Sequence, residues 1–143
     1  MGPNFFIVGG AKCATTNISY YLNQHSDVFI PELNEPYYYC RFDVPKFFER
    51  DSMITDEKKY LELFKKGINH KAIGEATPNY IQCPHSALEI KKDFPNSKII
   101  ISVRNPIDRA HSGYFSYKFM ELDQRTFSEK IDLYEDQYNR KEF

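Results

Sequence analysis

Two short, uninterrupted apolar runs, each followed at once by a helical pattern, most constrain how this chain can fold. The first lies at residues 5–8, and the second is the three isoleucines 99–101 within the strand pattern 98–103. Continuous apolar runs of this length are typical of strands buried on both faces of a parallel sheet. Weaker strand patterns lie at residues 28–30 and 72–75. Strands that alternate with helices predict an α/β domain with a mainly parallel central sheet flanked by helices.

Apolar spacing and capping residues place the helices between these strands. We expect a helix capped by Asn105, with Pro106 at its first position, where a missing N–H costs nothing. Thr55 can cap an earlier helix, and Thr126 with Glu129 forms a capping box for the last one. The other helices are expected at residues 15–24, 56–66, 84–93 and 127–140. The predicted buried stripe of the Asn105 helix is Ala110, Gly113, Tyr114 and Tyr117.

Composition narrows the class of protein further. A chain of 143 residues suggests one domain. Its net charge of −1 argues against a generally basic nucleic-acid binder, and no apolar run approaches the roughly 18 residues that span a bilayer. Three cysteines, Cys13, Cys40 and Cys83, are an odd number without a CxxC pair. The expected location is therefore a reducing, cytoplasmic compartment.

The segment 9–16 joins the first strand to the first helix and is the first candidate site. Its small residues let the backbone approach a ligand, and successive N–H groups at a helix start attract anions. Lys12 adds a positive charge, and the hydroxyls of Thr15 and Thr16 add donors. These features favour phosphate or sulfate binding over the alternative, an ordinary strand–helix turn with a solvated lysine.

This loop differs from the nucleotide triphosphatase loop. That motif needs G-x-x-x-x-G-K-[ST], but counting from Gly9 the sixth position is Ala14 and the lysine comes three places too early. A thiol phosphatase loop is also excluded, because Ser19 stands where an arginine should follow Cys13. Cys13 is therefore interpreted as a small residue that fills the loop.

A second candidate anion site follows the strand pattern at 98–103. Arg104 stands at the strand end, and Ser112 lies about two turns into the next helix. An arginine and a hydroxyl in this arrangement can hold one phosphate from two sides. Taken alone, the segment is better explained as a structural arginine–carboxylate pair beside a helix serine.

Together the two segments resemble the PAPS-dependent sulfotransferases, which use 3′-phosphoadenosine 5′-phosphosulfate, and most closely the heparan-sulfate and related bacterial branch. The family's P-K-x-G-T-T loop corresponds to residues 11–16, and the resemblance also covers residues 34–39 and 74–80. The resemblance spans most of residues 5–118. The family's R-N-P-x-x-R-x-x-S-x-Y motif is matched by Arg104, Asn105, Pro106, Arg109, Ser112 and Tyr114.

The resemblance implies a P-loop-like three-layer fold and a role for each matching residue. Lys12 would contact the oxygen that bridges phosphate and sulfur, Arg104 and Ser112 would hold the 3′-phosphate, and Glu35 would act as the general base. No metal is required. Other candidate bases are His25, His70, His85, His111 and Glu75. The implied 5′-phosphosulfate site consists of Ala11, Lys12, Cys13, Ala14, Thr15 and Thr16.

The chain departs from the family pattern at three positions. Ala11 replaces a proline, Ala14 replaces a glycine, and Ala76 stands where the branch often has a lysine. If position 14 needs a positive φ, alanine there costs stability or weakens binding. The family's domains also continue beyond residue 143, so we expect a single sulfotransferase-like domain over residues 1–143 without the family's C-terminal part.

The predicted partners are the nucleotide donor and an unidentified hydroxyl- or amine-bearing acceptor, either a carbohydrate or a small molecule, with no nucleic acid and no membrane. Three alternatives remain: a module that binds PAPS or its product PAP without turnover, a nucleotide-dependent kinase, and an α/β domain without a ligand. The aromatic residues could line an acceptor groove, although core packing is favoured. They are Tyr37, Tyr38, Tyr39, Phe42, Phe47 and Phe48.

Overall fold

The computed structural model describes residues 2–41, 53–121 and 123–140. The chain divides into two compact units, Met1–Val103 and Arg104–Phe143, and each unit is described here by itself. The expectation that residues 1–143 form a single domain stays a prediction.

The first unit is built on a parallel sheet. Strand β1 (Phe5–Gly9) lies between β3 (Ala72–Ala76) and β4 (Lys98–Ile101), and β2 (Val28–Phe29) pairs with β3, giving the order β2-β3-β1-β4. Every pairing in this sheet is parallel. The predicted α/β class with a mainly parallel sheet is confirmed.

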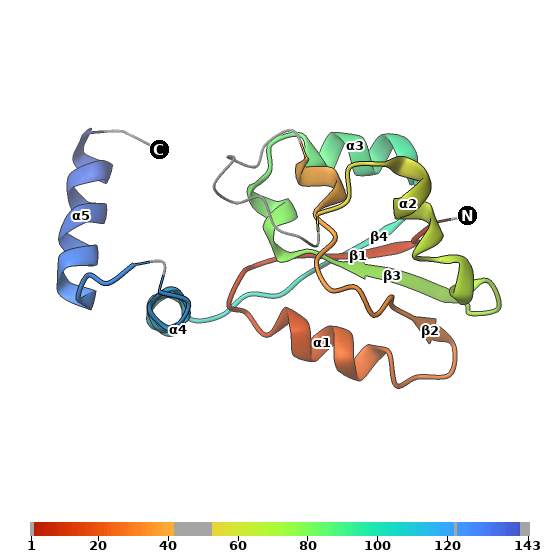
Figure 1. Ribbon diagram of the computed structural model, residues 1–143, viewed down its shortest axis with the longest axis horizontal. Helices are drawn as coiled ribbons and strands as arrows, with labels where there is room; N and C mark the ends of the chain where they lie inside the picture. The colour runs from red at the N-terminus through yellow and green to blue at the C-terminus, as the bar shows by residue number, and fades with distance from the viewer. Residues whose placement is uncertain (1, 42–52, 122, 141–143) are drawn as a thin grey trace. The chain divides into compact units, whose positions relative to one another are not determined.

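Helices cover both faces of this sheet, as the three-layer prediction requires. Figure 1 shows α1 (Thr15–Leu22) on one face and both α2 (Glu57–Glu62) and α3 (Ser86–Asp93) on the other. The described part of this unit also contains short 3₁₀ turns, which are η1 (Tyr38–Cys40), η3 (Lys65–Gly67) and η4 (Pro78–Gln82). The predicted Thr55 cap is wrong by one residue. Asp56 caps α2, because its carboxylate accepts the Lys59 N–H at 2.9 Å.

Strand β1 is the centre of the core because its side chains alternate between two apolar clusters. Phe6 and Val8 pack with the tyrosines of η1, α2 and η4 on one face. Phe5 and Ile7 pack with Ile30 and Ala76 on the other face, which α1 covers. All five residues of β1 are buried, as the continuous apolar run predicts.

The same prediction is wrong for β4. Among the strands that the structure describes, β4 lies at the edge of the sheet and pairs with β1 alone. Its side chains Ile99 and Ile101 are about half exposed, at 49% and 54%. An edge strand has a neighbour on only one side, so an apolar sequence does not by itself bury it.

The second unit contains α4 (Pro106–Phe119) and α5 (Phe127–Arg140). Asn105 caps α4 by accepting the Ile107 N–H at 2.9 Å, as predicted. The capping box is also confirmed, since Glu129 accepts the Thr126 N–H at 2.6 Å. The predicted buried stripe of α4 is wrong, because α4 buries no residue. Tyr114 is instead half-exposed, and its ring packs against the Phe127 ring with the ring centroids 5.3 Å apart.

Candidate functional site

The candidate site lies at the carboxyl edge of the parallel sheet, where ligands of open α/β sheets bind. Three backbone hydrogen bonds bring the strand ends together there: Gly10 N–H to Ser102 O at 2.7 Å, Ser102 N–H to Gly9 O at 2.7 Å, and Thr77 N–H to Ile7 O at 3.1 Å. The loop after β1 and the segment after β3 therefore converge within the first unit. The segment from Arg104 onward belongs to the second unit.

The loop after β1 presents Lys12 to solvent and holds two residues in the left-handed backbone region. Lys12 has φ 64° and Ala14 has φ 62°. A left-handed conformation costs an L-residue roughly 1–2 kcal/mol, which explains why the family has glycine at position 14. Cys13 between them is buried and not disulfide-bonded, in line with its interpretation as a residue that fills the loop.

Helix α1 begins directly after this loop and points its first N–H groups into it. Ala14 is the N-cap residue, and its methyl group has no acceptor for the N–H groups that remain unpaired in a helix's first turn. Thr15 is buried, whereas Thr16 is exposed. An exposed lysine beside uncapped helix N–H groups is an arrangement that attracts an anion.

Glu35 lies in a short, constrained segment between β2 and η1. It is half-buried and has φ 54°, and Tyr37 two residues later has φ 53°. Pro36 between them is fully buried, and its carbonyl accepts the Ile54 N–H at 2.9 Å. The Tyr37 hydroxyl donates to Glu35 Oε2 at 2.6 Å and lies 3.5 Å from Asn79 Oδ1.

The tyrosines at positions 37–39 are core residues, as favoured from the sequence. All three are buried, and the Tyr38 and Tyr60 rings stack with centroids 4.2 Å apart. Phe42, Phe47 and Phe48, the other candidates for an acceptor groove, lie outside the described residues.

Glu75 belongs to the core, where three hydroxyl groups surround it. Tyr60 donates to its carboxylate at 2.6 Å, Thr77 at 2.6 Å and Tyr80 at 3.1 Å. Burial raises the pKa of Glu75 to about 7, because loss of hydration outweighs these three hydrogen bonds, which lower it. With only 2% of its surface exposed, Glu75 is placed to organise the core rather than to meet an acceptor.

Sequence reasoning missed a disulfide bond between Cys40 and Cys83. The two residues are 43 positions apart, with Cα atoms separated by 5.6 Å. The residues around each cysteine contain no pattern that predicts the pairing. The bond joins the end of η1 to the residue after η4. Cys13 is the cysteine left unpaired, so the odd number of cysteines did not exclude one disulfide bond.

In the second unit, Arg104 is exposed and directly precedes the α4 cap residue, and Ser112 is half-buried two turns into α4. Two of the histidines considered as bases make local contacts. The His111 ring packs against the Phe115 ring with centroids 4.7 Å apart, and His25 Nδ1 accepts the Asp27 N–H at 3.1 Å. Both contacts are typical of structural histidines.

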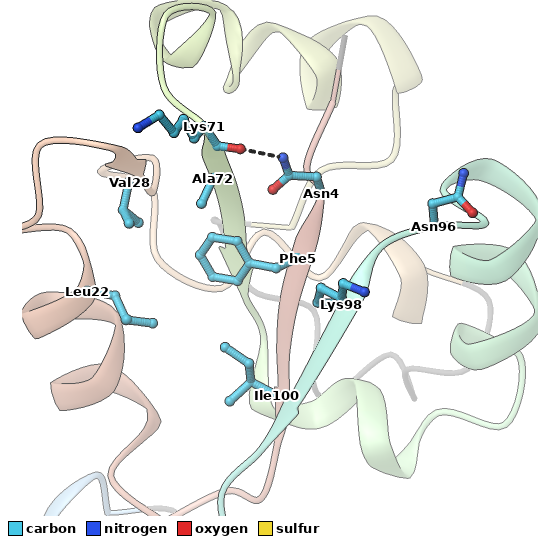
Figure 2. Close-up of a pocket in the computed structure, with 9 residues that line it drawn as sticks. All are labelled: Asn4, Phe5, Leu22, Val28, Lys71, Ala72, Asn96, Lys98 and Ile100. Atoms are coloured by element: carbon cyan, nitrogen blue, oxygen red, sulfur yellow. Dashed lines mark hydrogen bonds between the residues drawn. The ribbon is translucent and has the colours of Figure 1, made fainter.

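A cavity of about 460 Å³ lies at the other end of the strands. Figure 2 shows Phe5, Leu22, Val28 and Ile100 around it, with Asn4 at the start of β1 donating to the Lys71 carbonyl. It opens at the amino ends of β1, β3 and β4, away from the Lys12 loop. Its largely apolar lining does not resemble an anion site.

The described part of the chain contains no cluster of three or more His, Cys, Asp or Glu residues able to hold a metal ion. Nor is any helix within the described ranges long and apolar enough to cross a membrane.

Comparison with known proteins gives a consistent result. A family model described as the Sulfotransferase family matches residues 3–142. A membrane-associated sulfotransferase, kil1, of Dictyostelium discoideum is 32% identical over 85% of this chain, and human carbohydrate sulfotransferase 15 is 23% identical over 90%. The crystal structure of a sulfotransferase from Alicyclobacillus acidocaldarius matches 98% of the chain with a TM-score of 0.87 and 35% identity.

The chain is shorter than these relatives. It spans 25% of the Dictyostelium protein, 30% of the human protein and 60% of the solved chain.

Proposed function

Since the chain belongs to the sulfotransferase family, with the P-loop-like α/β fold of its solved relative, we propose that it transfers a sulfuryl group from PAPS to an acceptor hydroxyl or amine. The observation that carries this proposal is the loop after β1. There an exposed Lys12 stands beside the uncapped N-terminus of α1, an arrangement suited to a phosphosulfate.

The loop residues have distinct roles in this proposal. The N–H groups of residues 11–16, namely Ala11, Lys12, Cys13, Ala14, Thr15 and Thr16, surround the 5′-phosphate, and the Thr15 and Thr16 hydroxyls add donors. Lys12 contacts the oxygen that bridges phosphorus and sulfur. When the bridging S–O bond breaks, its electron pair stays on this oxygen, so the ammonium group stabilises charge that develops in the transition state.

Arg104 and Ser112 hold the 3′-phosphate in the proposed complex, as the family motif that they match suggests. A guanidinium group can bind a phosphate in a bidentate manner, and a helix hydroxyl adds a further hydrogen bond. Since ATP lacks a 3′-phosphate, this contact would distinguish PAPS from ATP. No metal ion takes part in the proposed step.

Glu35 is the proposed general base. As the acceptor oxygen or nitrogen forms its bond to sulfur, the Glu35 carboxylate takes the acceptor's proton, and PAP leaves. The acceptor class that we propose is a carbohydrate or a small molecule, and the relative described as a carbohydrate sulfotransferase supports the first. A cytoplasmic location remains a prediction, against which the Cys40–Cys83 bond argues, because disulfides persist mainly in oxidising compartments.

One observation favours a second candidate function. Ala14 adopts a left-handed conformation where the family has glycine. The resulting backbone strain weakens binding of the sulfuryl end of PAPS to the loop in this alternative. The alternative is a module that binds PAP or PAPS without turnover.

The test is transfer of ³⁵S-sulfate from PAPS to three acceptor probes: heparosan, desulfated chondroitin and p-nitrophenol. We expect transfer to at least one probe, with Lys12→Ala slowing it by about 10²–10³-fold and Glu35→Gln slowing it by about 10²–10⁴-fold. Lys66→Ala and Glu32→Gln are matched controls, since both residues are exposed in the same unit. PAP binding without transfer to any probe would favour the binding module, and equal rates in Lys12→Ala and the wild type would refute the assignment of Lys12.

A further inference from the structure

We propose that Tyr37 is a positioning residue, which holds the Glu35 carboxylate in the orientation that proton removal needs. The inference rests on the proposed function of Glu35 as general base. Its foundation is the hydrogen bond of 2.6 Å from the Tyr37 hydroxyl to Glu35 Oε2. Nothing in the sequence motifs singles out this tyrosine, which belongs to a run of three.

The Tyr37 ring is a rigid support for this hydrogen bond. Only 3% of the residue is exposed, and it packs in the cluster that contains Phe6 and Tyr60. Its carbonyl accepts the Cys40 N–H at 2.9 Å, which closes η1. A hydroxyl on a ring fixed in this way cannot follow a moving carboxylate, so the hydrogen bond restricts Glu35 rather than Tyr37.

The segment after β3 lies beside the same hydroxyl and also packs against the Lys12 loop. Asn79 Oδ1 lies 3.5 Å from the Tyr37 hydroxyl, and Asn79 belongs to η4. The same turn packs against the start of the loop, because a β-carbon added to Gly9 would lie 2.7 Å from Ile81 and 3.1 Å from the Pro78 carbonyl. Turn η4 therefore contacts both the beginning of the phosphate loop and the tyrosine that holds the base.

The chemistry of the pair fits a role in proton transfer. A phenol has one proton, and of the Tyr37 contacts to Glu35 and Asn79 the shorter is to Glu35. A hydrogen bond donated to Oε2 fixes the plane of the carboxylate, and removal of a proton requires that plane to face the acceptor. Glu35 and Tyr37 also keep left-handed backbones on both sides of a buried proline, and such outliers concentrate at functional sites.

The test compares Tyr37→Phe with Tyr38→Phe. Both changes remove one hydroxyl from a buried tyrosine of the same segment, but only Tyr37 donates to Glu35. For Tyr37→Phe we expect a 10- to 100-fold lower kcat and a KM for PAPS within twofold of wild type. Tyr38→Phe should keep the wild-type kcat and KM.

A second measurement does not depend on turnover. Carbon-13 NMR of protein labelled at glutamate carboxyl carbons observes the Glu35 resonance, assigned by its loss in Glu35→Gln. We expect the chemical shift of this resonance at neutral pH to change in Tyr37→Phe, which loses the hydrogen bond, and to stay in place in Tyr38→Phe.

The outcomes separate the two proposals. An unchanged Glu35 chemical shift and an unchanged kcat in Tyr37→Phe would overturn the positioning role even where Glu35→Gln abolishes transfer. Full activity in Glu35→Gln would instead refute the base assignment and with it the catalytic meaning of the Tyr37 contact, whatever the NMR spectrum shows.

Discussion

The Ser102 hydroxyl donates to the Cys13 carbonyl at 2.6 Å. This bond fastens the middle of the Lys12 loop to the residue that follows β4, beside the two backbone hydrogen bonds between Ser102 and residues 9 and 10. The loop's conformation therefore depends on the end of a strand far away in the sequence. For Ser102→Ala we expect about 1 kcal/mol lower stability and severalfold weaker PAP binding, measured by urea unfolding and calorimetry. Unchanged PAP affinity would show that the contact does not shape the loop.

Ala14→Gly should stabilise the protein. Glycine adopts φ 62° without the steric cost that alanine bears there, and the expected gain in unfolding free energy is about 1 kcal/mol, reduced by the extra freedom of glycine in the unfolded chain. The measurement is urea unfolding, with Ala110→Gly as the control. Ala110 is exposed and has a right-handed helical backbone within α4, so glycine there should lower the stability. Equal losses in both variants would contradict the conformation assigned to Ala14.

The buried Glu75 should make stability depend on pH. Its pKa is raised to about 7 in the folded protein, so the folded state binds the proton more tightly than the unfolded state. The resulting stability is fully present below the unfolded pKa, near 4.5, and is lost as the pH rises through about 7. Between pH 5 and 8 we expect the wild type to lose up to about 3 kcal/mol through this group.

Urea unfolding of Glu75→Gln at pH 5 and pH 8 checks this expectation. The variant cannot ionise, so its stability should vary less across this range than that of the wild type or of the exposed-site control Glu32→Gln. A slope equal to the wild-type slope would assign the pH dependence to other groups.

The Cys40–Cys83 bond should be present in protein isolated without reductant. Alkylation and mass spectrometry should find one free thiol, that of Cys13, and one cross-linked peptide pair. Reduction should lower the unfolding free energy by about 2–4 kcal/mol, because the bond closes a long loop in the unfolded chain. Cys13→Ser should leave this difference unchanged. Three freely alkylated thiols in the folded, unreduced protein would contradict the bond.

Local sequence signals predicted much of the fold. The apolar run at β1 and the residues that cap α4 and α5 carry their information within a few positions, and the structure confirms them. The family motif has glycine at position 14, and this departure raised the question whether the backbone there needs a positive φ. Ala14 has that conformation.

The errors share a physical cause. The exposure of β4 depends on its place at the edge of the sheet, and the Cys40–Cys83 bond depends on a contact across 43 residues. Both follow from which distant segments meet in space, and periodicity and spacing carry little information about that.

Calorimetric titration with PAP and with AMP is the sharpest test of the proposed nucleotide site, because the two nucleotides differ by the 3′-phosphate alone. We expect PAP to bind at least tenfold more tightly than AMP, Lys12→Ala to weaken the binding of both, and Arg104→Ala to weaken PAP binding and remove its advantage over AMP. Equal affinities of the unaltered chain for PAP and AMP, or no binding of either, would contradict the proposed site.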